Sequence, residues 1–439
     1  MSGSGLTRHK NLLLFAGVAL LFLLSGAMNS WNYAFSLLNF SLIFAVMALG
    51  LNLQWGFAGL FNTGLMGFAA LGGLAVVLVA SEPVPQGWAL GGPRLMLALA
   101  FGVAAMVATV ALYRRMHAGR NRNIAMVIVL TAAFFAYRAI YDPAVTGIES
   151  FESATYGNMG GLGLPALLAW PVGGLLAAAA AWAIGKTALG LRSDYLAIAT
   201  LGIAEIIVSV LKNEDWLARG VKMVNDLPRP WPVYEEVVLQ QTPWFTDMAA
   251  NWGFDPVTGS SILVKLLYAM LFITVLAAVI WLTERALASP WGRMMRAIRD
   301  NEVSAAAMGK DVKRQHLQVF ILGSAIVGVG GAMLTNMQGL MNPGTYNPLQ
   351  FTFLIWVMVI VGGSGSNWGS VLGGLFIGWL WLVAENLGPG LMQAFTALIP
   401  DGFVKTTLNA NAQHMRLLFI GVILLLVLRF NPRGLIPEK

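Results

Sequence analysis

Residues 11–81 read NLLLFAGVALLFLLSGAMNSWNYAFSLLNFSLIFAVMALGLNLQWGFAGLFNTGLMGFAALGGLAVVLVAS, and none of these 71 residues is Asp, Glu, Lys, Arg or His. A second run, residues 317–384, contains no Asp, Glu, Lys or Arg in 68 positions. A helix needs about 20 apolar residues to cross a bilayer, so each run has room for two or three membrane-spanning helices. The two runs therefore predict a polytopic membrane protein.

The overall composition supports this class of protein. Hydrophobic residues make up 57% of the chain and charged residues only 11%, whereas soluble domains are about 25% charged. A water-soluble globule could not bury so much apolar surface. The chain has no Cys, which excludes disulfides and thiolate metal sites. Its four His are too far apart in the sequence to indicate a shared metal site. We therefore expect no metal and no other cofactor.

Twelve apolar segments follow one another along the chain. Their length, and the absence of a ten-residue alternating pattern, favour membrane helices over a β-barrel. Residues 350–362 are too short to cross an average bilayer unaided, which favours a half-helix or a re-entrant piece. We expect an all-α fold with 10–12 transmembrane or re-entrant helices in a single domain, residues 12–430. The segments are 12–29, 33–52, 57–80, 94–113, 123–141, 163–185, 194–211, 262–282, 317–340, 350–362, 370–387 and 414–430.

The distribution of charge orients these segments. If the chain alternates through twelve crossings, 18 of its 27 basic residues lie on one side and eight on the other, with net charges of +12 and −4. Loops rich in Lys and Arg are usually cytoplasmic. This places the N-terminal segment 1–11, the loop 283–316 and the C-terminal tail 431–439 inside, and the loop 212–261 outside. It also explains the pI of about 9.7 without a nucleic acid partner.

Two of the connecting loops are long. The inside loop contains RMMRAIRDNEVSAAAMG, residues 293–309, which is rich in good helix formers and ends on Gly309. We expect a short helix lying across the membrane face, with Glu302, Ala305 and Gly309 near one side of it. The outside loop 212–261 can be a docking surface, a lid over an entrance, or an interfacial flap without a partner.

No motif for energy conversion or catalysis is present. Residues 185–187, GKT, resemble the end of a phosphate-binding loop, but Ala180 occupies the position of its required first glycine. The sequence has no HExxH and no GxSxG. We therefore do not expect an enzyme. If the protein moves a solute uphill, the energy comes from a coupled ion or from another subunit.

Polar residues inside the apolar segments are costly unless they have partners or a function. Glu205 follows Asp194 by 11 residues, which is about 16 Å along a helix and near mid-bilayer. It can line a solute path, relay protons or serve as a hydrogen-bonded structural carboxylate. Other polar residues interrupt the segments near 52–63 and 364–367, where exposed backbone could bind a zwitterionic solute. The path candidates are Asn52, Gln54, Asn62, Thr63, Glu205, Ser364, Ser366 and Asn367.

Five stretches resemble a known family when taken together. They are ALGLNLQWGFAGLFNTGLMGF (48–68), RSDYLAIATLGIAEII (192–207), GRMMRAIRDNEVSAAAMGKDV (292–312), VGGSGSNWGSVLGG (361–374) and NPRGL (431–435). They look like the permease subunits of ATP-driven branched-chain amino acid importers, specifically the longer, second permease of the pair. The resemblance covers roughly residues 40–435.

The resemblance implies a bacterial inner-membrane heterodimer with a sister permease, two cytoplasmic ATPase subunits and an extracytoplasmic substrate-binding protein. It also implies that the inside loop couples to the ATPases. The chain departs from the family pattern at Ser193, where glycine is usual, and at 217–230, which lacks the usual Gly-Gly-Pro. Other small zwitterionic or neutral amino acids, urea and short amides therefore stay open as substrates. The implied coupling residues are Arg296, Arg299, Glu302, Ala305, Ala306 and Gly309.

Two other classes of protein are alternatives. A proton-coupled secondary transporter would use Glu205, but it would need no basic, helical inside loop and would be expected to show an inverted repeat. A membrane-embedded enzyme would need a catalytic constellation that the sequence lacks.

Overall fold

The structure is a computed structural model that describes residues 3–152, 157–251, 253, 255–397 and 399–438. Its described residues form helices and connecting segments, and no strand is present among them. In this described part of the chain, extended backbone pairs only at two isolated bridges, Pro83 with Gly160 and Val224 with Met341. The all-α prediction is confirmed.

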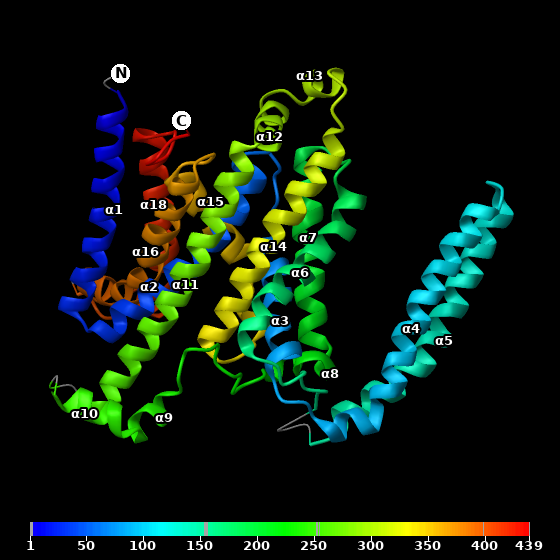
Figure 1. The fold of residues 1–439 in the computed structure, drawn as a ribbon, viewed down its shortest axis with the longest axis horizontal. Helices are drawn as coiled ribbons and strands as arrows, with labels where there is room; N and C mark the ends of the chain where they lie inside the picture. The colour runs from blue at the N-terminus through cyan, green and yellow to red at the C-terminus, as the bar shows by residue number, and fades with distance from the viewer. Residues whose placement is uncertain (1–2, 153–156, 252, 254, 398, 439) are drawn as a thin grey trace.

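Each of the twelve predicted segments corresponds to one helix, wholly or in part (Figure 1). Nine helices in the described chain are long and apolar enough to cross a membrane. A tenth arises if α17 (Phe403–Ala410) and α18, which meet at 74°, count as one span. Helices α3 and α15 are shorter, and for α15 this agrees with the short predicted segment 350–362. The twelve helices are α1 (Gly3–Met28), α2 (Trp31–Leu51), α3 (Leu65–Ala80), α4 (Pro85–Arg115), α5 (Arg120–Ser150), α6 (Ala169–Ala188), α7 (Ser193–Asn213), α11 (Pro256–Ala288), α14 (Val312–Gln338), α15 (Pro348–Gly362), α16 (Asn367–Thr396) and α18 (Met415–Phe430).

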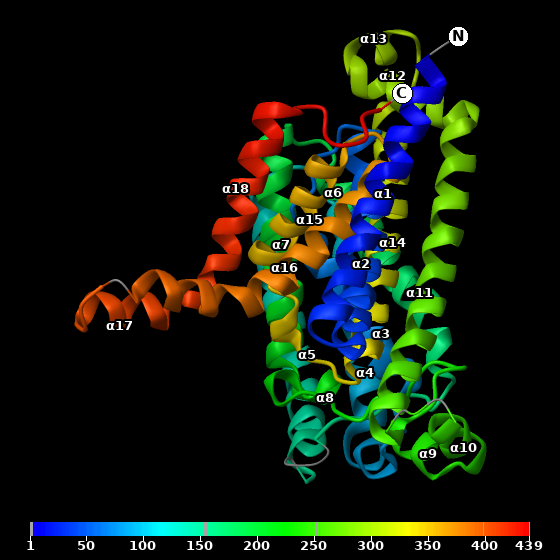
Figure 2. The same ribbon diagram turned by 90° about the vertical axis from the view of Figure 1, so that its left-hand side faces the viewer.

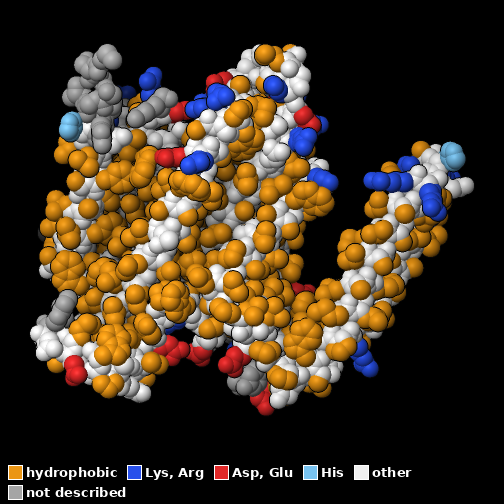
Figure 3. Space-filling model, viewed as in Figure 1, with side chains coloured by type: hydrophobic (Ala, Val, Ile, Leu, Met, Phe, Trp, Pro, Cys, Tyr) orange, Lys and Arg blue, Asp and Glu red, His pale blue; other side chains and the backbone are white. Residues whose placement is uncertain are grey.

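The molecule has two distinct ends (Figures 1 and 2). One holds the N-terminus, the C-terminus, α12 (Pro290–Asp300) and α13 (Glu302–Ala307), and we call it the α12 end. The other holds α8 (Asp215–Ala218), α9 (Glu236–Gln241) and α10 (Pro243–Asn251), and we call it the α9 end. Figure 3 shows hydrophobic side chains over the middle of the molecule, with Lys and Arg mostly at the α12 end and Asp and Glu at both ends.

The core of the bundle is built around α2 and α14, which pack against α3, α6 and α16. Small residues allow this close approach: a Cβ on Gly331 would lie 1.9 Å from the carbonyl oxygen of Ala69, and one on Gly72 would lie 1.8 Å from that of Gly328. Such backbone-to-backbone packing is typical of membrane helices. Helices α4 and α5 form a separate hairpin that stands away from the bundle (Figure 1).

The connecting segments are shorter than the sequence indicated, because the helices extend further. Helix α7 continues to Asn213, and α11 begins at Pro256 after Asp255 caps it by accepting a hydrogen bond from the Thr258 amide. At the α12 end, α11 continues to Ala288 and α14 begins at Val312. These extra turns leave residues 214–255 and 289–311 as connections.

Two local predictions need correction. The segment 57–80 is helical only from Leu65. Helix α2 ends in one π-helical turn, η1 (Asn52–Gly56), and residues 57–64 between η1 and α3 are irregular. The single helix expected over 293–309 is two helices, because the Asn301 side chain accepts a hydrogen bond from the Ser304 amide and starts α13 anew.

Candidate functional site

The break between α2 and α3 is held by buried side-chain amides. Asn52, Gln54 and Asn62 are fully buried. The Gln54 Nε2 donates to the carbonyl oxygen of Phe320 at 3.0 Å and to Ser324 Oγ at 3.1 Å, both on α14. The Asn62 Nδ2 donates to Gln54 Oε1 at 2.8 Å. Irregular backbone within a membrane needs such internal partners, so these amides stabilise the break.

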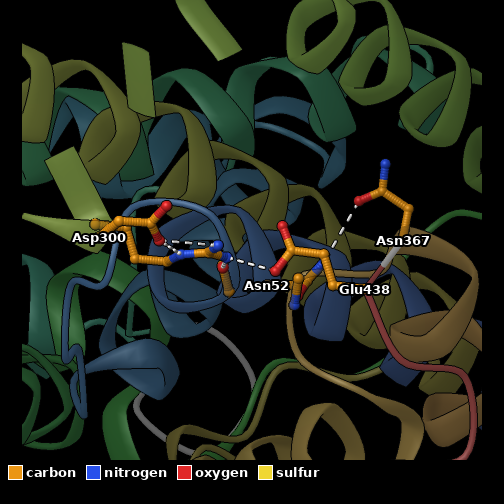
Figure 4. A network of polar contacts seen from close by, with 7 residues as sticks. Asn52, Asp300, Asn367 and Glu438 are labelled. Atoms are coloured by element: carbon orange, nitrogen blue, oxygen red, sulfur yellow. Dashed lines mark hydrogen bonds and ion pairs between the residues drawn. The ribbon is translucent and has the colours of Figure 1, made fainter. Parts of the chain in front are cut away.

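A polar network joins this break to α12 (Figure 4). The Nη1 of Arg299 donates to the carbonyl oxygen of Gly56 at 2.6 Å and to the Glu438 carboxylate at 2.8 Å. Burial disfavours the charge on Arg299, but the hydrogen bond and the negative charge of Glu438, helped by Asp300, outweigh this effect and raise the pKa of Arg299. Arg299 therefore stays charged and ties α12 to the end of α2 and to the C-terminal tail.

The same network includes the turn between α15 and α16. The Asn52 Oδ1 accepts a hydrogen bond from the Gly365 amide at 2.9 Å, and the Asn52 Nδ2 donates to Asn367 Oδ1 at 3.3 Å (Figure 4). Gly365 has a φ of +78°, and a Cβ there would lie 2.7 Å from the Glu438 carboxylate. Only glycine fits this turn without displacing the tail.

The predicted coupling residues have different surroundings. Ala305 is 7% exposed and buried within this chain, whereas Ala306 and Glu302 are exposed. The expectation that Glu302, Ala305 and Gly309 share one helix face is wrong, because α13 ends at Ala307 and Gly309 lies beyond it with a φ of +77°. Arg296 is half-buried and directs its Nη2 toward the carbonyl oxygen of Leu287, at 3.5 Å.

Glu205 and Thr63 lie apart from the network. The Thr63 Oγ1 donates to the carbonyl oxygen of Ala197 at 2.6 Å and thereby joins the break to α7. Glu205 is exposed on α7, on a strip with Ile198, Gly202 and Ser209. Among the described residues Glu205 has no ion-pair or hydrogen-bond partner.

The remaining candidates belong to the turn before α16. Ser366 caps α16 by accepting a hydrogen bond from the Gly369 amide at 3.1 Å, and Ser364 is half-exposed beside it. The structure therefore brings Asn52, Gln54, Asn62 and Asn367 together and leaves Glu205 on a separate face. In the described part of the chain, no group of three His, Cys, Asp or Glu side chains could hold a metal ion.

Several residues at this site were missed by sequence reasoning. Glu438 reads as part of a solvated tail, and nothing local indicates its bond to α12. Trp356 donates from Nε1 to the carbonyl oxygen of Asn62 at 3.0 Å, and its ring centroid lies 4.7 Å from that of Trp55 and 4.5 Å from that of Phe61. Aromatic residues close to a polar break were the available signal for this cluster.

Comparison with known proteins places the chain in a family. The family described as "Branched-chain amino acid transport system / permease component" matches residues 33–158 and 145–428. The high-affinity branched-chain amino acid transport system permease protein LivM of Escherichia coli K12 is 26% identical over 293 residues, which are 66% of this chain and 61% of LivM. The chain thus spans about three fifths of the length of that relative.

Two further relatives are matched over shorter stretches. A probable LivM of Methanocaldococcus jannaschii is 29% identical over 36% of this chain and 42% of its own length. The permease protein LivH of Salmonella typhimurium is 29% identical over 28% of this chain and 39% of its own length. No solved structure matches the chain significantly. The family match extends over most of the chain and includes both the polar break and α12, so this protein belongs to the permease family of branched-chain amino acid transport systems.

Proposed function

We propose that this protein is the longer of two permease subunits in an ATP-driven importer for branched-chain amino acids in a bacterial inner membrane. The observation that carries the proposal is the network in which Arg299 joins α12 to the break after α2. An importer driven by separate ATPases needs such a link, because force must pass from a surface helix to the membrane helices. The chain has no phosphate-binding loop, so ATP is hydrolysed by other subunits.

The proposal fixes an orientation and the positions of the partners. The α12 end, with both termini and residues 283–316, faces the cytoplasm, in accord with its excess of Lys and Arg. Two ATPase subunits dock there, against α12 and α13 of this chain and the matching segment of the sister permease. The substrate-binding protein docks at the α9 end, on residues 212–261.

The exposed strip of α7 faces the sister permease. A carboxylate near mid-bilayer is unfavourable against lipid, so Glu205 needs a protein partner or a water-filled path beside it. Thr63, in the break before α3, is half-buried and donates to Ala197 near the start of α7. In this arrangement Glu205 and Thr63 line the path between the two permeases, while Asn52, Gln54, Asn62 and Asn367 support the break behind it.

Uptake by the reconstituted complex tests this function. We expect vesicles that hold both permeases, the ATPases and the binding protein to accumulate leucine, isoleucine and valine only when ATP is inside the compartment with the ATPases. Urea, short amides and other amino acids belong in the same panel, because Ser193 and residues 217–230 depart from the family pattern. Uptake of urea instead of amino acids would overturn the substrate assignment. Uptake driven by a proton gradient without the ATPases would overturn the importer class.

The Glu205→Gln variant tests the role of the carboxylate. We expect it to lower leucine uptake only partly, by roughly two- to tenfold, because the amide retains most of the hydrogen-bonding capacity. The pH profile of uptake should stay unchanged, since the carboxylate is not expected to carry a proton. Complete loss of uptake together with loss of pH dependence would favour a proton-coupled transporter. Ser209→Ala, on the same exposed strip, is the control for packing at this face.

A further inference from the structure

A cavity of about 230 Å³ lies between α2, α3, α14, α15, α16 and α18. Most of its wall is apolar and well packed: Met47, Met66 and Leu334 are buried. On one side the aromatic rings follow in series, with the Phe351 centroid 6.3 Å from that of Phe44 and 5.9 Å from that of Trp381. Pockets for drug-sized ligands are about 300–1,000 Å³, so this cavity suits a smaller solute.

One end of the cavity carries both signs of charge. The Glu385 carboxylate and the Arg416 guanidinium form an ion pair at 3.2 Å, and Arg416 also lies 4.3 Å from the centroid of the Trp381 ring. Both charged side chains are partly exposed, so Glu385 has acceptor sites and Arg416 has N–H donors that remain available to a ligand. Gln338, the last residue of α14, also lines the cavity, so part of its wall lies toward the α9 end.

Two residues of the cavity wall lie near the polar break along the chain. Met47 precedes Asn52 by five residues on α2, and Met66 follows Asn62 by four residues at the start of α3. Both methionines therefore lie close along the chain to the break that the hydrogen bond between Asn62 and Gln54 holds. The wall of the cavity is thus continuous along the chain with the segment that Arg299 connects to α12.

We infer that this cavity binds the transported amino acid as a zwitterion. Its carboxylate pairs with Arg416, its ammonium group pairs with Glu385, and its branched side chain lies between Phe351, Met66 and Leu334. The inference rests on the proposed function and deepens it, because it places a solute site inside this subunit rather than only between the two permeases. A zwitterion enters a low-dielectric site only if both charges find partners, and this cavity supplies one of each.

The chemistry of the wall selects against the alternative occupants. Urea has no apolar part, and its amide groups would lie unpaired against methionine, leucine and phenylalanine side chains. A lipid acyl chain would match the wall, but it would leave the ion pair without a role. A compact apolar side chain joined to a charged head uses both parts of the cavity.

Substitutions that change the volume of the cavity test this inference, and the measured quantity is the relative transport rate of different amino acids. The reconstituted complex is supplied with saturating binding protein loaded with alanine, leucine or phenylalanine, so that the permease sets the rate. We expect Leu334→Phe to lower the leucine-to-alanine rate ratio about tenfold or more, since one methylene group changes selectivity by about 10- to 200-fold. Met66→Ala enlarges the cavity, so it should raise the phenylalanine-to-leucine rate ratio. The matched control is Leu418→Phe, because Leu418 is exposed on α18.

The charged end is tested in the same assay. Arg416→Gln should lower the rate for every amino acid at least about tenfold, and Arg416→Lys should restore part of it. The control is Arg285→Gln, which also removes a guanidinium that lies over a tryptophan ring, that of Trp281 at 5.0 Å. If the wild-type complex transports amino acids but neither Leu334→Phe nor Met66→Ala changes the ratios, the cavity is not the site. If the wild-type complex transports no amino acid, the proposed function and this inference both fail.

Discussion

Ala306→Glu is expected to detach the ATPases from the complex and to abolish uptake. Ala306 is exposed on α13, and the neighbouring Val303 and Met308 are 79% and 80% exposed, although both are apolar. Exposed apolar side chains at a membrane protein's polar end indicate a protein contact. A buried charge in such a contact costs about 2 kcal/mol or more, which is about 30-fold in affinity. Co-purification of the ATPases and ATP-dependent uptake should fall together.

The fold itself should tolerate this change, because the Ala306 side chain lies outside the packed core. We therefore expect Ala306→Glu to insert and to pair with the sister permease as the wild type does. Val237→Glu, which places the same charge on an exposed apolar residue of α9 at the other end, should keep the ATPases. Ala305→Glu is a poorer test, since Ala305 is buried and the variant would disturb α13 directly. If Ala306→Glu retains both ATPase binding and uptake, α12 and α13 are a connector.

Arg299→Gln is expected to separate ATP hydrolysis from transport. The variant loses the ion pair to Glu438 and the strong hydrogen bond to the carbonyl oxygen of Gly56. Hydrogen bonds to charged groups contribute about 1.5–3 kcal/mol, so the link between α12 and the break should weaken by at least about tenfold. The ATPases should stay attached, because the exposed apolar face of α13 is unchanged. The number of leucine molecules taken up per ATP hydrolysed should therefore fall.

Two further variants separate the contributions of Glu438 and Asp300 to this network. Glu438→Gln keeps the bond between Arg299 and Gly56, so it should lower the ratio of uptake to hydrolysis less than Arg299→Gln does. Asp300→Asn should change little, because Asp300 is mostly exposed and surface ion pairs contribute at most about 1 kcal/mol. An unchanged ratio in Arg299→Gln would show that force reaches the membrane helices by another route.

Much of the architecture could be predicted from local pattern alone. The bilayer requires long apolar helices, so the uncharged run 11–81 already indicated several spans. The asymmetry of Lys and Arg predicted that the termini and residues 283–316 share one end, and the structure brings them together. Gly309 was expected to stop a helix, and α13 ends two residues before it. These features depend on segment length, charge and backbone preference, which are properties of neighbouring residues.

The site depended on which helices pack together. Asn52 and Asn367 are 315 positions apart, and Arg299 and Glu438 are 139 apart. The local spacing of residues in the sequence gives no indication of such distant pairs. The depth of Glu205 followed from its spacing to Asp194, but its exposure did not, because α7 is apolar on more than one side. The cavity beside Phe351 and Arg416 is likewise made by six helices whose faces meet only in the folded bundle. The sequence by itself determined the helices and which of their connections lie at the same end of the molecule, because the bilayer acts on each segment separately. The tertiary structure decided the polar partners and the cavity, because these arise only where distant segments pack.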